Sequence, residues 1–586
     1  MKKKLALLLA IVMTVSLFAA CGSSDSGSTD TPGTDTPAAT TDTTTDGDST
    51  DTTDDTPAAT GTMYKGDTTP ITFTFFSEDG NRDQPFDTVI AQKITEITGV
   101  TLRFDYPVGE VNTRIPLMVA SGDLPDLVYG KGTGSAQLID AGAAINLAPM
   151  IENSNYVKDF YGDLLSRLWY EGDSSTIYSF GAYQINQPIW NVESSMPIQN
   201  AVLKEFGYPE IRTVYDVEDL IRRYVELYPE INGRPTYGLT INNADGWRYI
   251  IDLGNPAGHL TGFHDDGEWI VDETTLEASI KYLNPALKEH FAWLNKMWNE
   301  GLIDPDSFTQ TNDDYIAKIS NGQVLALLSP QWQYNDARLA LINNGMGERT
   351  YAHLPITYDA NVRPVNSYDI GWSGGWGVMI TNACSDPQRA FDFVDWMTSE
   401  EGLTLRYWGV EGIHYDVVDG IRVLKPEVRT ALDTDPDYGN AQGFDWAYPF
   451  PEMGDGHTDS TGSTITRNTT QAIIDAYTDE AKETLAAYGA EMWADLFPPT
   501  SDFELSPFGA AWQIDVPPDS EINDRVQWVQ NTWMPQEMSR VVTASTDDFE
   551  QLWEEAQQKL IDGRVYELNE MFTELVRAKA RAWGNY

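Results

Sequence analysis

The sequence predicts an α/β fold of two lobes, each built on a mostly parallel sheet flanked by helices. Three observations support this prediction. Strand and helix patterns alternate from residue 71 onward, residues 63–586 exceed the length that one hydrophobic core usually organises, and no repeat or second low-complexity linker interrupts them. Ligands of such sheets bind at the carboxyl ends of the strands, so we expect the functional side chains there.

The first elements are predicted to form a strand–helix–strand unit. Residues 71–75 (ITFTF) alternate apolar and polar side chains, as a strand does. Asp87 can cap a following helix, Gly99 is suited to end it, and residues 100–104 supply the next strand. The apolar residues of this helix include Ile90, Ile94 and Ile97.

Further helices are predicted by apolar residues at helical spacing. Residues 217–225 follow the i, i+3, i+4 stripe of an amphipathic helix. A helix is expected over 285–301, because it opens with a proline and closes with a glycine. Another begins near 386–387, and the C-terminal end of the chain reads as two helices broken near 562–563.

The N-terminus has the pattern of an export signal. Three lysines precede an apolar run from Leu5 to Ala20, and Cys21 follows two alanines. This order resembles a bacterial lipobox, with Phe18 where leucine is usual. We predict a lipoprotein signal peptide over 1–20, with Cys21 as the lipidated N-terminus on the outer face of the cell membrane. The alternative is a plain secretory signal or a short membrane anchor, although the run is short for the ~20 residues of a spanning helix.

Residues 21–62 are predicted to be a disordered tether. From Gly22 to Gly61 the chain contains no aromatic and no large aliphatic residue, so it cannot bury enough surface to offset the entropy of ordering. A glycosylated or wall-crossing stalk is the alternative. Of the two cysteines, Cys21 is assigned to the lipid, and Cys384 is expected to be a small buried residue.

The chain is strongly acidic, with a formal net charge of −51 over 586 residues. Such a chain repels phosphate backbones and anionic lipid surfaces, so we expect no nucleic-acid partner and no membrane contact beyond the lipid anchor. No P-loop, HExxH or CxxC motif is present. Carboxylate pairs are too numerous in an acidic chain to indicate a glycosidase by themselves.

Five motifs follow one another between residues 67 and 425. They read TGV at 98–100, ASGDLPDLV at 120–128, LNKMWNEGLIDP at 294–305, ISNGQVLALLSPQW at 319–332, and DPQRA at 386–390 continuing through SEEG at 399–402 to GVEGIHY at 409–415. Together and in this order they resemble bacterial extracellular solute-binding proteins of family 1, the receptors of ABC sugar importers. The similarity is greatest to the large lipoproteins associated with oligosaccharides.

The resemblance implies a type II periplasmic-binding-protein-like fold with the ligand cleft between two hinged lobes. It implies a monomeric receptor that performs no chemistry, needs no cofactor and delivers a carbohydrate to ABC permease subunits. Residues 430–545 are less similar and are expected to be insertions. Relatives often carry a calcium loop where residues 228–237 read YPEINGRPTY, with Tyr228, Thr236 and Tyr237 at carboxylate positions. Because calcium needs several carboxylate oxygens, we expect a plain turn and no metal there.

Candidate ligand-binding residues combine aromatic platforms with groups that can bind sugar hydroxyls. Most large aromatic residues of any protein belong to its core, so a place in the hydrophobic core is the alternative to ligand binding for each tryptophan. Trp332 is similar to the tryptophan of the family's "GPW" turn, which stacks on a sugar ring. Trp372 and Trp376 lie in the glycine-rich stretch 371–377, which suits a loop that approaches a ligand closely. The other candidates are Trp408, Glu411, His414 and Tyr415 in GVEGIHY, Glu78, Asn81 and Arg82 after the first strand, and Asp126.

The predicted function is therefore a membrane-anchored substrate-binding protein that captures an oligosaccharide or other carbohydrate. Two alternatives remain open. One is a surface glycoside hydrolase or lyase with two catalytic carboxylates. The other is a receptor for peptides or other solutes, or a receptor that serves sensing.

Overall fold

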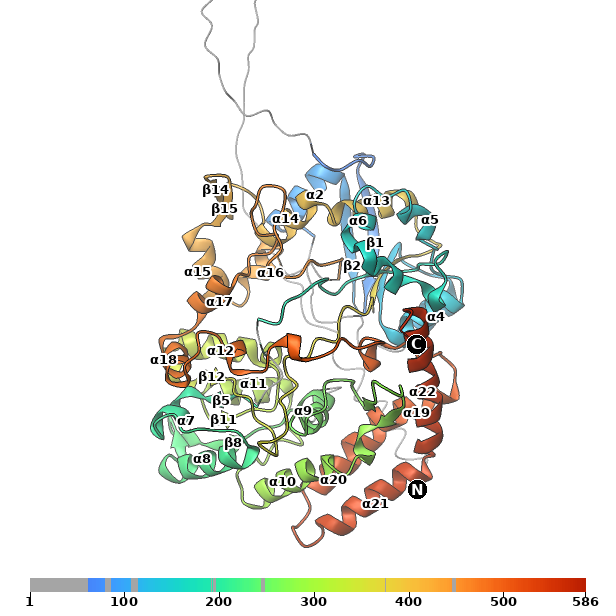
Figure 1. The fold of residues 1–586 in the computed structure, drawn as a ribbon. Helices are drawn as coiled ribbons and strands as arrows, with labels where there is room; N and C mark the ends of the chain where they lie inside the picture. Colours follow the sequence, from blue (N-terminus) through green and yellow to red (C-terminus); the bar gives the residue numbers. More distant parts are fainter. Residues whose placement is uncertain are drawn as a thin grey trace, which may run out of the picture. The chain divides into compact units, whose positions relative to one another are not determined.

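A computed structural model describes residues 62–78, 86–106, 114–190, 192, 196–243, 248–374, 376–444 and 449–585. Two large hydrophobic cores divide these residues into two lobes (Figure 1). The core of lobe 1 draws on residues 64–185 and 372–450, and the core of lobe 2 on residues 196–358 and 481–580. The chain therefore passes between the lobes three times, which fits the predicted two-lobe α/β fold. Within the described ranges, no helix is both long enough and apolar enough to cross a membrane.

Lobe 1 is built on a five-stranded sheet in the order β2–β1–β3–β13–β4. β1 pairs in parallel with β2 and β3, whereas β13 runs antiparallel to β3 and β4. The carboxyl ends of β1, β3 and β4 therefore share one edge with the amino end of β13. The strands are β1 (Ile71–Ser77), β2 (Val100–Asp105), β3 (Leu127–Gly130), β4 (Phe180–Gly181) and β13 (Gly377–Ile380).

Both faces of this sheet are covered by a hydrophobic core. Because the side chains of a strand alternate between its faces, neighbouring residues of β1 belong to different cores. Phe73 and Phe75 belong to the larger core of lobe 1, which α2 and α13 help to form, and Phe76 packs with the residues of α3 and α4 on the other face. The helices are α2 (Val89–Thr98), α3 (Arg114–Ser121), α4 (Gly132–Asp140), α5 (Ala148–Ile151), α6 (Val157–Tyr161), α13 (Pro387–Met397), α14 (Glu400–Trp408), α15 (Pro426–Thr434) and α16 (Tyr438–Gln442).

The first helix begins one residue later than predicted. Thr88, not Asp87, is the N-cap of α2, because its backbone is extended and its hydroxyl accepts the Ala91 N–H at 3.3 Å. Gly99 ends this helix with a φ of 71°, as predicted. Cys384 is buried, in agreement with its predicted structural role.

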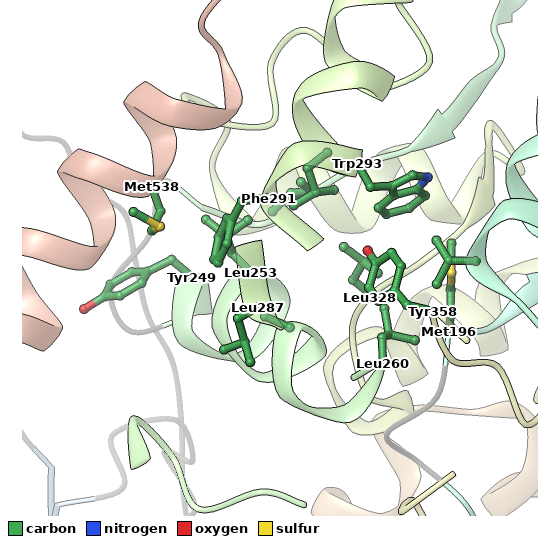
Figure 2. Packing of buried hydrophobic residues seen from close by; sticks show 14 of the residues in the cluster. Met196, Tyr249, Leu253, Leu260, Leu287, Phe291, Trp293, Leu328, Tyr358 and Met538 are labelled. Carbon is green, nitrogen blue, oxygen red and sulfur yellow. The ribbon is translucent and has the colours of Figure 1, made fainter. Parts of the chain in front are cut away.

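Lobe 2 is built on a four-stranded sheet in the order β12–β5–β11–β8. β8 and β11 are parallel, and β5 runs antiparallel to both of its neighbours. The strands are β5 (Ile198–Gln199), β8 (Tyr237–Leu239), β11 (Val324–Ala326) and β12 (Tyr351–Ala352). Figure 2 shows the adjoining core, in which Trp293 and Tyr358 lie near Leu328 and Met196.

The helices of lobe 2 include the predicted amphipathic helix, now α8, which is opened by a capping box between Thr213 and Asp216. The helix predicted over 285–301 begins at Leu287, so its proline lies in the preceding turn. The helices are α7 (Asn200–Glu205), α8 (Val214–Leu227), α9 (Asn255–His259), α10 (Leu287–Asn299), α11 (Asn312–Ser320), α12 (Gln331–Asn343), α17 (Thr470–Ala476), α18 (Asp479–Tyr488), α19 (Glu521–Trp528), α20 (Ser539–Val542), α21 (Phe549–Asp562) and α22 (Val565–Ala582).

Short elements complete the chain. Three hairpins are formed by β6 (Glu230–Ile231) and β7 (Arg234–Pro235), β9 (Trp269–Val271) and β10 (Ala278–Ile280), and β14 (Tyr415–Val418) and β15 (Ile421–Leu424). The 3₁₀ segments are η2 (Gly162–Leu168), η3 (Tyr170–Gly172), η5 (Lys281–Leu283), η6 (Gly347–Arg349), η8 (Trp493–Leu496), η9 (Thr500–Asp502) and η10 (Ala511–Gln513), and the π-helical segments are η4 (Ile250–Gly254) and η11 (Val529–Met538).

The segment compared with a calcium loop is the β6–β7 hairpin. Asn232 and Gly233 form its turn, with φ values of 53° and 74°, a conformation that the Asn-Gly pair favours. The backbone pairing of Ile231 with Arg234 closes this turn.

Candidate ligand-binding site

The carboxyl edge of the lobe 1 sheet gathers several of the predicted residues. Glu78 follows β1, Lys131 follows β3, and Trp376 immediately precedes β13. Glu78 is 8% exposed, and its Oε2 accepts the Lys131 N–H at 2.5 Å. A Cβ at Gly134 would lie 2.7 Å from both carboxylate oxygens of Glu78, so a larger residue there would push this carboxylate out of its place.

Three aromatic rings stand together at this edge. The Trp376 ring lies 5.3 Å from the Trp512 ring and 6.1 Å from the Tyr183 ring, measured between centroids. Lys131 Nζ lies 4.7 Å from the Trp376 centroid, within the range of a cation–π contact. The Trp376 Nε1–H is enclosed and has no hydrogen-bond acceptor among the described residues. Since an enclosed indole N–H usually has an acceptor, this unsatisfied donor distinguishes Trp376 from Trp372, whose N–H is hydrogen-bonded.

A cavity of about 260 Å³ opens beside this cluster, between α4 and α19. It is shared by both lobes, and Thr133 of lobe 1 donates to Asn523 of lobe 2 at 3.5 Å. The lining consists of Glu78, Lys131, Thr133, Gly134, Gln137, Asn523 and Gln527. This lining has no aromatic residue, but its carboxylate, amide, hydroxyl and ammonium groups suit the hydroxyls of a sugar, and Lys131 connects the cavity with the Trp376 ring.

A larger cavity, of about 570 Å³, lies on the other side of α4, towards α22. Arg167 and Lys579 flank the Trp583 ring there, at 4.5 and 5.1 Å from its centroid. Burial raises the pKa of Asp515 to about 6, against the opposing effect of Lys579. Both cavities have sizes of the order of small-ligand pockets, but the smaller one adjoins the strand ends where α/β sheets bind ligands.

Trp332 lies at the equivalent edge of the lobe 2 sheet. It is the second residue of α12, shortly after β11, and its side chain is 52% exposed. Beneath this edge, Asn242 N–H donates to the enclosed carboxylate of Asp252 at 3.1 Å. Burial raises the pKa of Asp252 to about 7.

Trp372 lies in a different environment from Trp376. It is 8% exposed, packs against Tyr161 at a centroid distance of 5.2 Å and belongs to the core of lobe 1. Its Nε1–H donates to the Tyr183 carbonyl at 2.9 Å, so it supports the residue that faces Trp376.

Asp126 links three segments of lobe 1. Its carboxylate accepts the backbone N–H and hydroxyl of Thr74 at 2.8 and 2.7 Å, and those of Ser385 at 2.7 and 2.8 Å. Burial raises the pKa of Asp126, but the four hydrogen bonds outweigh that effect and hold its pKa below the usual value. Through these contacts Asp126 holds Thr74 and Ser385 together, and we call this arrangement a structural clamp.

The four candidates of the GVEGIHY segment lie together at the base of the β14–β15 hairpin. Trp408 Nε1–H donates to the carbonyls of Thr464 and Ile465, and the Tyr415 ring packs against Trp408 at 6.0 Å. His414 is fully buried, where its Nδ1 accepts the Val410 N–H at 2.9 Å. Glu411 is exposed beside them. Their contacts are with residues 410–465 and not with the Trp376 cluster.

Cys21, Asn81 and Arg82 lie outside the described residues. The structure adds Lys131, Tyr183, Trp512 and Asn523 to the candidate site. Lys131 directly follows the strand of the ASGDLPDLV motif, a signal that the sequence offers. Trp512 and Asn523 lie in residues 430–545, where no motif distinguishes them.

Two sheets with one antiparallel strand each, joined by three crossings of the chain, form the two-lobe α/β architecture. The family profile described as "Bacterial extracellular solute-binding protein" matches residues 90–412, and the protein belongs to this family.

Curated relatives are distant. Lipoprotein LipO of Bacillus subtilis (strain 168) is 21% identical over 345 residues, which cover 56% of this chain and 64% of that protein. An uncharacterized protein in the butB 5′ region of Niallia circulans is 25% identical over 132 residues, 22% of this chain and 50% of the relative. The matches thus span less than two thirds of the length of either relative.

Solved structures share the fold over most of the chain. The alginate-binding protein AlgQ2, solved without calcium, has a TM-score of 0.60 at 16% identity and covers 87% of this chain and 98% of its own. FusA, an S. pneumoniae ABC-transporter substrate-binding protein in complex with kestose, has a TM-score of 0.60 at 15% identity, covering 88% and 99%. An HMO-binding solute-binding protein of Bifidobacterium longum infantis has a TM-score of 0.60 at 15% identity, and the match covers 87% of this chain and 99% of that protein.

Proposed function

We propose that this protein is the ligand-binding component of an ABC importer that captures an oligosaccharide between its two lobes and releases it unchanged to a permease. The observation that carries the proposal is the Trp376–Trp512–Tyr183 cluster beside Glu78 and Lys131 at the carboxyl edge of the lobe 1 sheet. Closure of the lobes by a hinge would bring Asn523 and Gln527 onto the same ligand.

The structural neighbours support the carbohydrate class. AlgQ2 binds alginate by its name, FusA is in complex with kestose, and the Bifidobacterium protein binds HMO. The proposal further includes export by residues 1–20, lipidation of Cys21 and a tether over 21–62, supported by the N-terminal pattern and by the lipoprotein relative. The proposed site residues are Trp376, Glu78 and Lys131 in lobe 1, with Trp332 at the edge of lobe 2.

A thermal unfolding screen of the soluble chain from Gly22 onwards against a panel of oligosaccharides tests the proposal. A ligand that binds only the native state adds ~2.7 kcal/mol of stability at a hundredfold excess over its Kd. We expect a clear upward shift of Tm with at least one sugar, which product analysis then finds intact. A shift accompanied by cleaved sugar would instead establish a glycoside hydrolase or lyase, and a response to peptides alone would remove carbohydrate from the proposal.

A further inference from the structure

The β14–β15 hairpin carries an exposed apolar face. Its strands pair Asp416 with Val423 and Val418 with Ile421, so these four side chains lie on one face. Val418, Ile421 and Val423 are 53%, 42% and 48% exposed. We call these four residues the hairpin face. Three exposed β-branched residues on one short hairpin form a contiguous apolar surface of the kind that marks interaction sites.

The hairpin is held rigidly from behind. An isolated two-stranded hairpin is marginally stable in water, so the bracing is informative. Arg422 forms an almost fully buried ion pair with Asp459 at 2.6 Å, and its guanidinium lies 5.4 Å from the centroid of Trp408. Trp408 in turn donates to the carbonyls of Thr464 and Ile465. The GVEGIHY segment and residues 459–465 thus present the hairpin face in a fixed position.

The start of the described chain is anchored beside the same support. Glu401 accepts the Met63 N–H and the Thr62 hydroxyl, both at 2.8 Å. The adjacent Glu400 accepts the Ser460 N–H at 2.8 Å, in the loop that braces the hairpin. The first turn of α14 therefore joins the point where the N-terminal segment enters lobe 1 to the support of the hairpin. A chain anchored through Cys21 would be held to the membrane from this part of lobe 1.

We propose that the hairpin face is the surface with which lobe 1 docks on the membrane-embedded permease. This inference rests on the proposed function, because it assumes a permease that receives the ligand. The seat on the permease would be an apolar hollow with a basic side chain opposite Asp419 at the hairpin tip, since Asp416 within the face is already paired with Lys425 at 3.3 Å. So small an apolar contact suits a transient interface that must release after each delivery.

Charge argues against the two other occupants of this face. Pairing with a second copy about a two-fold axis would bring two chains of net charge −51 together. An anionic lipid surface repels the same net charge. The face itself has no aromatic side chain, and the neighbouring Lys425 is paired with Asp416 at 3.3 Å, unlike the unpaired lysines of interfacial binders.

Val418→Asp in the full-length chain tests the docking surface, with Leu117→Asp as the matched control. Leu117 is also an exposed apolar residue of lobe 1, on α3. Cells that carry each variant as their only copy are assayed for uptake of the sugar identified by the screen, and the purified variants for its Kd. We expect uptake by Val418→Asp to fall at least about tenfold with Kd unchanged, because a charge buried in an apolar contact costs more than ~1.4 kcal/mol.

Other outcomes overturn the inference. Uptake that is unchanged by Val418→Asp, or lost equally with Leu117→Asp, removes the hairpin face from docking. A weakened Kd would place the hairpin in the ligand site. Val418→Thr, which keeps a β-branched side chain, is expected to lower uptake less and guards against a misfolded hairpin.

Photo-crosslinking in cells gives a readout that does not depend on the sugar. A benzoylphenylalanine at position 421 of the full-length chain is expected to yield an adduct with a multi-span ABC permease subunit, identified by mass spectrometry, that the same probe at position 117 does not form. Adducts with lipid alone, or with a second copy alone, contradict the inference. If the screen finds no sugar while this adduct forms, the carbohydrate proposal fails and the docking surface stands.

Discussion

Replacing Asp126 by alanine is expected to destabilise lobe 1 while leaving ligand affinity unchanged. The carboxylate accepts four hydrogen bonds of 2.7–2.8 Å from Thr74 and Ser385, and so links β1, the loop before β3 and the turn before α13. Asp126 is 9% exposed, so few water molecules can replace the lost acceptor. The clamp therefore acts on stability, not on the ligand.

The magnitude follows from the number and type of these bonds. A hydrogen bond to a charged group contributes ~1.5 kcal/mol at the low end of the measured range, so four such bonds sum to about 6 kcal/mol at that low end. Local relaxation and entry of water recover part of this, and we expect a loss of about 3–5 kcal/mol in the free energy of unfolding. Asp123→Ala, in the same turn but exposed, is the matched control.

The assay is urea unfolding of the soluble chain from Gly22 onwards, followed by tryptophan fluorescence and repeated at several pH values. Hydrogen bonding lowers the pKa of Asp126 in the folded state. The stability that its carboxylate contributes is therefore complete above the unfolded pKa of about 4, and it is lost as the pH falls through the folded pKa. The gap between wild type and Asp126→Ala should therefore narrow below about pH 4. A loss under 1 kcal/mol at pH 7, or a loss of affinity for the sugar at full stability, would refute the clamp.

Three further predictions follow from the structure. Trp376→Ala should weaken binding of the sugar at least about tenfold by calorimetry, because the ring is expected to pack on the ligand; unchanged affinity would remove it from the site. Burial lowers the pKa of His264, but the ion pair with Asp266 at 3.0 Å and the charges of Glu273 and Asp265 raise it above its usual value. Its contribution to stability is therefore complete below about pH 6.5 and lost as the pH rises through the folded pKa, so the Tm advantage of wild type over His264→Gln should shrink from pH 6 to pH 9; an advantage that grows would contradict this. Because backbone pairing closes the β6–β7 turn, Tm should be the same in calcium and in chelator; a calcium-dependent Tm would contradict it.

Local patterns predicted the elements, because short-range spacing determines them. The first strand–helix–strand unit, the amphipathic α8, the helix after Asp386 and the two C-terminal helices are present at the expected places. The errors lie at the ends of helices, where a single hydrogen bond determines which residue begins the helix. Thr88 competes with Asp87 for the same cap, and the chain before α10 continues as a turn for two residues.

The candidate site was less predictable, because long-range packing decides which aromatic residues face the cleft. The glycine-rich stretch offered Trp372 and Trp376 equally, yet the first packs on Tyr161 and the second on Trp512. Trp512 is 136 residues further along the chain, so no local pattern connects it with Trp376. Likewise, the bracing contacts of Trp408 come from residues 464–465 in a poorly recognised stretch.

Isothermal titration of the sugar identified by the screen into the wild-type chain, with analysis of the recovered sugar, tests the central claim most directly. The account predicts that one ligand binds per chain, that Trp376→Ala weakens the affinity for this ligand, and that the sugar is recovered intact. A sugar that is cleaved, or binding that Trp376→Ala leaves unchanged, would contradict a carbohydrate receptor with its site at the carboxyl edge of lobe 1.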